Sequence, residues 1–564
     1  MNMPRFGHFD KGNQARYRKT LRMFRNRNWS VLLQAASLLF AGNAISTRAG
    51  EFSFTVVDAD SKQPIACRVY LRNEMKNEIF FVRSRSGIPE IQYHKQSRMN
   101  PNSEEHHTSV ASGLCVAENL PAGSYSLTVE KGKEYFTQSL AFELAEDEVK
   151  PHETIELRRW SRVEELGWYS GETHLHRPLD QLPLLLLAED LNVAMPITYW
   201  VIDAFMPPKP WAKNPPGPIP DTLIEVDKTH VIWPRNTEFE ITKVANRQHI
   251  LGALFVLNHK SESPVGAPDW KPIAVRARSE GALMDMDKLD WPFAMTLPHT
   301  TGATLYELAN NHMWRTEFGL TQWVSKAPAF LQPPQGGGNG SELDWLAYTL
   351  GQYYTLLDAG FRLVPTAGTA SGVHPVPPGF GRVYVHLSGE FTYEKWIDGL
   401  VHGRSFVTTG PMIQADINQS LPGTILDQQT LTLSVEVKSV HPLKTLEIVR
   451  NGIVESHRPF STQQMENGAY RTTFLHSIEN DASGWLCVRC TEDRPDRRVR
   501  FAHTAPWWLH VAGKPLLPMQ HEKDYLIQRV TDEIQRSKDI LPPSAMAEYS
   551  SALNYFESLP ARDP

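Results

Sequence analysis

The chain has 564 residues, of which 41% are hydrophobic and 21% charged, and its formal net charge is −6 at pH 7. This length allows several domains, because a single hydrophobic core stops growing beyond roughly 250–300 residues. The acidic balance and the scattered Lys and Arg residues create no basic field that would attract nucleic acid, so we expect no nucleic-acid partner.

Residues 1–49 have the pattern of a signal peptide. A basic segment precedes an uncharged apolar run at 29–44, and small residues follow it up to Ala49, where a signal peptidase would cut. The apolar run is short and contains polar residues, which argues against a stable membrane span. We therefore expect an exported protein, periplasmic or extracellular, whose translation starts at Met1 or Met23.

Residues 50–160 are predicted to form an N-terminal β-sandwich. Apolar residues alternate with polar ones, as at Phe52 and Phe54, and turn residues separate several such runs. The segment resembles the transthyretin-like or carboxypeptidase-regulatory-like sandwiches found in front of exported hydrolases, which implies a spacer or structural cap. Cys67 and Cys115 would be able to form a disulfide in an exported protein.

Residues 161–409 alternate helix-length and strand-length apolar runs, which predicts a parallel sheet or barrel. The first strand, GWYSGETHLHRP at 167–178, ends in His174 and His176, and residues two apart in a strand project from the same face. Neutral imidazole is the commonest metal ligand, so both rings would reach one ion. Among 21 histidines, roughly one such pair is expected by chance, and its context must support the prediction.

Later apolar runs of this segment also end in histidines. His259 follows one run directly, and His299 and His312 lie just after two others. In barrels of parallel strands the chemistry collects at the carboxyl ends of the strands. We therefore expect these three residues to lie near His174 and His176.

The C-terminal part returns to strand periodicity and then becomes helical. Residues 410–515 are predicted to form a second β-sandwich, because Leu431 and Leu433 begin an alternating run and the Asn-Gly at 451–452 favours a hairpin turn. Residues 516–564 show apolar residues at helical spacing on two segments separated by a Pro-Pro break, which predicts a helical hairpin.

Several motifs follow one another along about residues 160–412: GWYSGETHLHRP, LLLLAEDLNVA, FEIT, VLNHK, ELANNH and GFGRVYVHLSGEFTYEKWIDGLVHGRSFVTTGPM. Their order resembles that of the CehA/McbA-type metallohydrolases, a branch of the PHP (polymerase and histidinol phosphatase) superfamily. The resemblance implies a distorted, TIM-like (β/α)7 barrel between the two sandwiches, which binds up to three divalent metals and hydrolyses ester or phosphoester-like bonds. His174 and His176 match the family's first motif, Glu238 is the candidate bridging carboxylate, and His259 matches a later histidine ligand.

Two sites depart from the family's pattern. Tyr199 and Trp200 stand where the family has an Asp-His pair, and Ala370 and Gly372 stand where it closes with Asp-x-His. These departures reduce the expected set of ligands. Three other histidines are candidate replacements or ordinary polar or core residues: His299, His312 and His374.

The expected centre would hold zinc, manganese or iron through imidazole nitrogens and carboxylate oxygens. Its candidate ligands are His174, His176, Glu238, His259 and His312. A divalent ion lowers the pKa of its bound water toward about 7, so a hydroxide becomes available to attack an acyl or phosphoryl centre. Glu238 would bridge metals or act as a base. Lys288 and Arg382 would stabilise developing negative charge if they reach the pocket, or else serve as surface or structural cations.

Two functions are compatible with these patterns. The first is an exported metal-dependent hydrolase that acts on an ester, carbamate or phosphoester bond of a small-molecule or glycan-type substrate. The second is a noncatalytic scaffold that binds a glycan or a protein, in which a PHP-like barrel has a degenerate metal site. Aromatic residues close to the motifs suit either stacking on a sugar or core packing. They are Trp168, Tyr169, Tyr199, Trp200, Trp314 and Tyr384.

Overall fold

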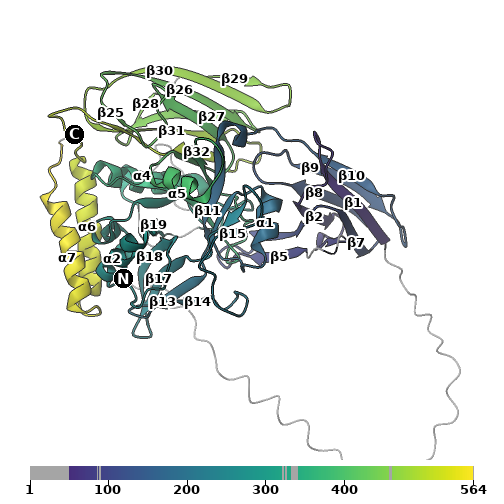
Figure 1. Cartoon of the computed structure of the whole chain (residues 1–564), viewed down its shortest axis with the longest axis horizontal. Helices are drawn as coiled ribbons and strands as arrows, with labels where there is room; N and C mark the ends of the chain where they lie inside the picture. The colour runs from purple at the N-terminus through teal and green to yellow at the C-terminus, as the bar shows by residue number, and fades with distance from the viewer. Residues whose placement is uncertain are drawn as a thin grey trace, which may run out of the picture. The chain divides into compact units, whose positions relative to one another are not determined.

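Strands outnumber helices in the computed structural model of the chain (Figure 1). The structure describes residues 50–562, apart from residues 86, 88, 89, 321, 322, 324, 326, 332–340 and 457–459. The predicted signal peptide at 1–49 lies outside the described residues. The several sheets are those of a β-rich multidomain protein, and the described residues all belong to one compact unit.

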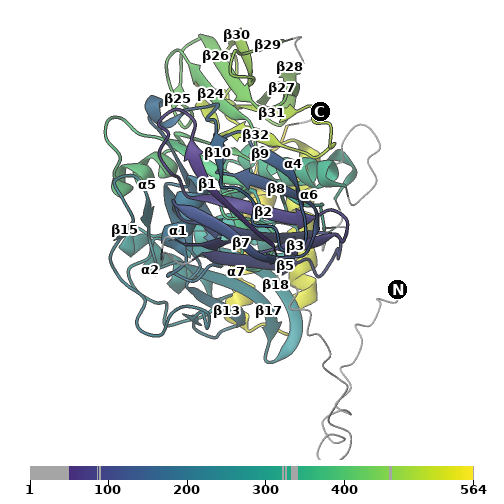
Figure 2. The ribbon, with the colours of Figure 1, turned by 90° about the vertical axis from the view of Figure 1, so that its right-hand side faces the viewer.

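The first part of the described chain forms two β-sheets that share one hydrophobic core (Figure 2). The first sheet consists of β10 (Glu153–Leu157), β1 (Gly50–Asp58), β7 (Leu114–Leu120) and β4 (Arg83–Ser84), in that order. The second consists of β5 (Ile91–Gln96), β6 (Glu104–Val110), β2 (Cys67–Asn73), β8 (Gly123–Glu130) and β9 (Gln138–Leu144), with β3 (Glu78–Phe80) paired to β2. Alternate side chains point into the core, where Phe54 joins Val69 and Leu127.

The central strands pair in a ring. They are β11 (Trp168–Leu175), β12 (Val193–Pro196), β13 (Tyr199–Asp203), β17 (Thr237–Val244), β18 (Arg247–Leu257), β19 (Leu283–Asp287), β20 (Leu305–Ala309) and β21 (Val364–Ser371). β11 pairs with β12, which leads directly into β13, and pairing continues from β13 through β17, β18, β19 and β20 to β21. β21 then pairs with β11 again. Every residue of β11 is buried, as expected for a strand covered on both faces.

The alternation of strands and helices expected from the sequence is interrupted between β17 and β18. These two strands form an antiparallel hairpin, which turns at Ala245 and Asn246 with positive φ angles of 48° and 62°. Two successive residues with positive φ are typical of a two-residue hairpin turn. β18 is also antiparallel to β19, whereas β19, β20, β21 and β11 run parallel to one another.

Helices connect many of the central strands (Figure 1). They are α1 (Leu182–Glu189), α2 (Trp270–Glu280), α3 (Leu297–Thr301), α4 (Glu342–Asp358) and α5 (Tyr393–Val401), with the 3-10 helices η2 (Glu164–Leu166), η3 (Pro292–Thr296) and η4 (Ala329–Leu331). The Ser341 side chain caps α4 by accepting a hydrogen bond from the backbone N–H of Asp344 at 3.1 Å. Short strands in the connection after β13 are β14 (Lys209–Pro210), β15 (Ile224–Glu225) and β16 (Val231–Ile232).

The C-terminal β-region continues from the central strands without a break. β22 (Arg382–His386) pairs with β11 and with β23 (Ser405–Thr408), and β23 pairs with β32 (Phe501–Thr504). Strands from both sides of the predicted boundary between residues 409 and 410 thus join in one sheet. The other strands are β24 (Met412–Ile417), β25 (Ile425–Leu426), β26 (Thr430–Ser439), β27 (Leu443–Arg450), β28 (Ile453–Ser456), β29 (Ser461–Gln464), β30 (Tyr470–Glu479), β31 (Gly484–Glu492) and β33 (Trp507–Leu509).

The chain ends in two helices, α6 (Gln520–Ser537) and α7 (Pro543–Ser558), which lie side by side (Figure 1). Leu526 of α6 and Tyr549 of α7 are fully buried in the same hydrophobic core as the central strands. The Arg529 guanidinium donates a hydrogen bond to the backbone carbonyl of Trp291 at 2.8 Å. The helical pair is thus part of the central core.

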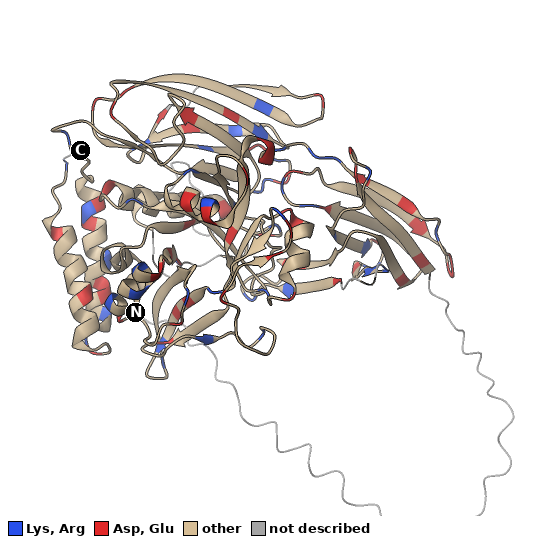
Figure 3. Cartoon of the chain, in the orientation of Figure 1, with Lys and Arg blue, Asp and Glu red and all other residues tan. Residues whose placement is uncertain are grey.

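Charged residues of both signs are interspersed along the same helices and strands (Figure 3). Cys67, Cys115, Cys487 and Cys490 are free and buried, so the first two do not form the disulfide considered from the sequence. Among the residues that the structure describes, no helix combines the length and the apolar character needed to cross a membrane.

Candidate metal centre

His174 and His176 lie at the end of β11 and point toward the same place. Their Nε2 atoms are 3.2 Å apart, and the two side chains are 1% and 3% exposed. Their two-residue spacing on an extended strand produces this convergence, as the sequence predicted. The Nδ1 atom of His174 is 2.9 Å from Oε2 of Glu307, which fixes the orientation of the ring and leaves Nε2 free to act as a ligand.

Glu238 on β17 completes a group of three ligands. Its Oε2 atom is 3.1 Å from Nε2 of His176, yet this oxygen has no hydrogen-bond partner among the described residues. Ligand atoms bound to one tetrahedral ion at about 2.0 Å are themselves roughly 3.3 Å apart. The two separations at His176 Nε2 therefore fit the coordination shell of one zinc-like cation, and the ligand atoms of His174 and Glu238 lie within 4.8 Å of each other.

A second group shares His174 with the first. It adds Asp287 at the end of β19 and Glu307 on β20, and each residue offers a ligand atom within 4.8 Å of the others. Sequence reasoning missed both carboxylates. The available clue was that each is an acidic residue inside a short apolar strand, where burial of a charge has to be compensated by a partner or a metal.

Lys288 supplies the positive charge nearest to these carboxylates. Its Nζ atom is 2.6 Å from Asp287 Oδ2, 2.8 Å from Glu238 Oε1 and 3.2 Å from Glu240 Oε1. Burial by itself would lower the pKa of Lys288, but the three carboxylates raise it well above its ordinary value. Burial would likewise raise the pKa of Glu238, but Lys288 and His176 lower it, so Glu238 is ionised.

The remaining groups have pKa values set mainly by burial. Burial lowers the pKa of both His174 and His176, which keeps the rings in the neutral form that binds metals. Burial and the nearby charge of Asp287 raise the pKa of Glu307 well above its ordinary value. Burial also raises the pKa of Asp285 well above its ordinary value. Its carboxyl group accepts hydrogen bonds from Thr366 Oγ1 at 2.7 Å and from Thr173 Oγ1 at 3.2 Å.

The structure does not bring His259 into this group. Its Nε2 atom is 2.9 Å from Thr237 Oγ1, and burial lowers its pKa to about 4. Because β18 runs antiparallel to β19, Leu257 at the end of β18 pairs with Leu283 at the start of β19, whereas Asp287 pairs with Ala253. His259, two residues after Leu257, therefore lies near the start of β19, whereas Asp287 lies at its end.

Arg382 and His312 also lie outside the two ligand groups. The Arg382 guanidinium donates hydrogen bonds to the backbone carbonyls of Gly379, Asp190 and Glu189, which is the structural role considered from the sequence. The His312 ring packs 5.6 Å from that of His374, and burial lowers its pKa to about 4. His299 lies on α3, where it contacts Ser551 of α7.

The positions that depart from the family's pattern have packing roles. Tyr199 is 1% exposed, and the Trp200 ring packs 5.5 Å from His176. Gly372 has a φ of 105°, and a Cβ atom there would lie 1.7 Å from the carbonyl oxygen of His176. The close approach of these two backbones leaves no room for a side chain at Gly372.

Aromatic side chains border the centre on the side of His176. Besides Trp200, the Trp211 ring lies 5.7 Å from that of His176, and Lys213 lies over the Trp211 ring at 5.2 Å. Trp200 and Trp211 are partly exposed. The other aromatic residues considered from the sequence are buried: Trp168, Tyr169, Tyr199, Trp314 and Tyr384.

Comparisons of the chain with protein-family models, with curated proteins and with solved structures give no match. The geometry of the His174, His176 and Glu238 group, with Asp287, Glu307 and Lys288 beside it, is therefore the basis for any statement about function.

Proposed function

We propose that the protein is a metal-dependent hydrolase that acts on an ester, carbamate or phosphoester bond. The observation that carries this proposal is the convergence of His174 Nε2, His176 Nε2 and Glu238 Oε2 in a buried site, at separations suited to one cation. Their mixed nitrogen and oxygen donors suit zinc, manganese or iron. When bound, such an ion polarises the scissile group and lowers the pKa of water.

The side chains of the candidate centre would have different roles in hydrolysis. His174, His176 and Glu238 hold the cation, and Glu307 keeps the His174 ring in the orientation that exposes Nε2. Lys288 keeps Glu238 ionised and places a positive charge beside the site, where negative charge develops as an acyl or phosphoryl centre is attacked. Asp287 offers a ligand atom within 4.8 Å of those of His174 and Glu307, so it is a further carboxylate available to a cation.

The ring of central strands supports a distorted PHP-like barrel as the scaffold of this site. Its pairing returns from β21 to β11, and the candidate ligands project from β11, β17, β19 and β20. The hairpin of β17 and β18 is the main departure from a regular alternation of strands and helices. Export remains part of the proposal on the basis of residues 1–49 alone.

The decisive experiment measures metal content and hydrolysis in the same preparations. Wild-type protein, purified without a chelating tag and dialysed against zinc, manganese or iron, is compared with a His174→Ala/His176→Ala variant by elemental mass spectrometry. We expect the variant to hold at least one metal equivalent less and to lose hydrolysis of aryl ester, carbamate and phosphoester probes at least 100-fold.

A matched control replaces two exposed histidines, His402 and His510, by alanine. This variant should keep the metal content and activity of the wild type. Equal metal content in the wild type and in the His174→Ala/His176→Ala variant would overturn the proposal.

The second candidate function is a noncatalytic glycan-binding scaffold, which the partly exposed rings of Trp200 and Trp211 beside His176 favour. Wild-type protein that binds oligosaccharides without any metal, and that loses this binding on Trp211→Ala, would select this function over hydrolysis.

A further inference from the structure

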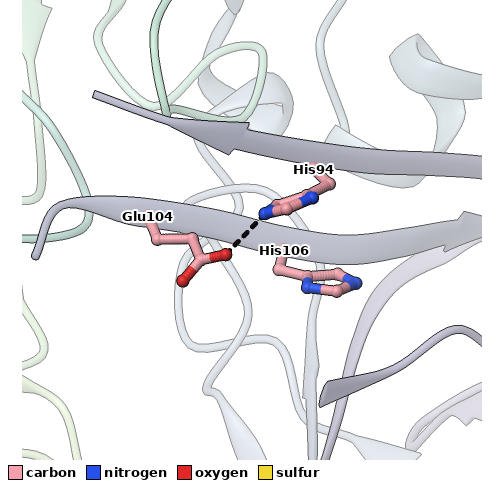
Figure 4. A group of neighbouring side chains, drawn as sticks. All are labelled: His94, Glu104 and His106. Carbon is pink, nitrogen blue, oxygen red and sulfur yellow. Dashed lines mark hydrogen bonds and ion pairs between the residues drawn. The ribbon is translucent and has the colours of Figure 1, made fainter. Parts of the chain in front are cut away.

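A second group of metal-binding side chains lies on the N-terminal sandwich, outside the candidate centre. β5 and β6 are antiparallel neighbours, with His94 directly opposite His106 and Gln96 directly opposite Glu104. Residues two apart on paired strands share one face of the sheet, so His94, His106 and Glu104 project from the same side. Figure 4 shows these three side chains together on this face.

The three side chains are close enough to share an ion. The His94 and His106 rings stack with centroids 4.6 Å apart and an interplanar angle of 23°, and Nε2 of His94 is 2.5 Å from Oε1 of Glu104. Each residue offers one ligand atom within 4.8 Å of those of the other two. The Nε2 atom of His106 is buried and has no hydrogen-bond partner in the part of the chain that the structure describes.

These positions are exposed enough for an ion to enter. His94 and Glu104 are exposed and His106 is half-buried, whereas their neighbours Tyr93 and Glu105 face inward and are buried. The outer face thus carries two imidazoles and one carboxylate on a paired, regular backbone. The side chains need only small rotations to place three donors around one point.

We propose that His94, Glu104 and His106 form a surface site for a zinc-like divalent cation. Two imidazole nitrogens and a carboxylate oxygen are a common donor set for zinc, and water would complete the coordination. The ion would replace the contact between His94 and Glu104 and would also engage the ring of His106. Because β5 is the outermost strand of its sheet, the ion would fasten an edge strand to its neighbour.

The inner face of the same hairpin contacts the loop beside the candidate centre. The Tyr93 hydroxyl accepts a hydrogen bond from the backbone N–H of Gly372 at 2.9 Å and donates one to the carbonyl of His374 at 2.5 Å. A cation on the outer face would therefore stabilise the strand that anchors residues 372–374. This inference does not depend on hydrolysis, since it concerns different residues on a different surface.

The test separates the two sites by using the His174→Ala/His176→Ala chain as the background. In equilibrium dialysis against micromolar zinc, we expect this background to retain about one zinc equivalent, and the same chain with His94→Asn/His106→Asn to lose it. A matched control, His402→Asn in the same background, removes an exposed histidine just after α5 and should retain the zinc.

A second measurement distinguishes the loss of the zinc site from misfolding of the His94→Asn/His106→Asn variant. Zinc should raise the melting temperature of the background, because a ligand bound only by the folded state stabilises it, and this rise should vanish with His94→Asn/His106→Asn. The proposed surface site would be overturned if the background bound no zinc. It would also be overturned if the background and its His94→Asn/His106→Asn variant bound equal amounts of zinc. Neither result would alter the comparison of wild type with His174→Ala/His176→Ala.

Discussion

At the scale of single residues, the balance of charge around Lys288 governs the candidate centre. The Lys288 side chain is 10% exposed, and its ammonium group contacts three carboxylates, those of Asp287, Glu238 and Glu240. A buried charge that loses its partner is strongly destabilising, because desolvation is then no longer offset. Without a metal, Lys288 is the main compensation for this acidic cluster.

Replacing Lys288 by methionine should therefore destabilise the metal-free protein by about 3–5 kcal/mol. Added zinc or manganese should restore much of this loss, because a divalent cation takes over the compensation of Glu238 and Asp287. Chemical denaturation with and without metal measures both effects. The control is Lys260→Met, at an exposed lysine, and a Lys288→Met protein as stable as this control would contradict the prediction.

At the scale of elements, the ends of β11 and β21 are held in close backbone contact. The backbone N–H of His176 donates to the carbonyl of Ser371 at 2.9 Å, and Gly372 follows with a φ of 105°. This contact sets where the His176 ring lies relative to His174. A glycine is required there for two reasons, its conformation and the absence of a Cβ atom.

Gly372→Ala should consequently displace His176 and weaken metal binding at least tenfold, because the new Cβ would lie 1.7 Å from the His176 carbonyl oxygen. Gly360→Ala is a matched control: its φ is also positive, 92°, but a Cβ atom there has nothing within 4 Å. The control should lose about 1 kcal/mol of stability through backbone strain and keep its metal affinity. Competitive titration with a chromogenic chelator compares the two, and equal affinities would refute the argument.

At the scale of the whole molecule, buried polar contacts join the C-terminal strands to the central helices. The Tyr354 hydroxyl of α4 donates to Nε2 of His503 on β32 at 2.8 Å, and His503 Nδ1 donates to the carbonyl of Thr504 at 2.6 Å. Burial lowers the pKa of His503 from 6.5 to about 3. The folded protein therefore holds this ring in its neutral form.

This contact makes stability sensitive to acid. Between pH 6.5 and 3 the unfolded chain binds a proton at His503 that the folded chain excludes, so the contribution to stability is complete above about pH 6.5 and is lost as the pH falls toward 3. At about 1.4 kcal/mol per pKa unit, the loss for this fully buried group is roughly 5 kcal/mol.

His503→Gln should flatten this part of the stability profile, since glutamine retains polar atoms but does not titrate. Urea unfolding at several pH values between 3 and 7 compares the slopes. The exposed His402→Asn variant serves as control and should keep the slope of the wild type. An unchanged slope in His503→Gln would show that other groups cause the acid sensitivity.

Local patterns in the sequence predicted features that depend only on neighbours in the chain. The period of two at Phe52 and Phe54 predicted strands with one buried face, and the spacing of His174 and His176 predicted two rings on one side of β11. Glu238 was instead the candidate bridging carboxylate implied by the family resemblance, and its Oε2 atom lies 3.1 Å from Nε2 of His176. The predictions of the strands and of the histidine pair succeeded because side-chain direction in a strand alternates regardless of the rest of the fold.

The expected alternation of helix and strand is interrupted at β18, and His259, which follows this strand, lies outside the two ligand groups. A run of apolar residues does not reveal the direction of a strand, and β18 reverses because a two-residue turn at 245–246 returns the chain at once. The end of β18 therefore lies beside the start of β19, away from Asp287.

The sequence by itself determined the β-rich character, the helical end of the chain and the pair of histidines on β11. Only the tertiary structure decided that Asp287 and Glu307 join His174, that Lys288 compensates the acidic cluster, and that Arg382 binds backbone carbonyls. The physical reason is that local spacing fixes the direction of a side chain, whereas charge compensation and metal geometry depend on which strands become neighbours.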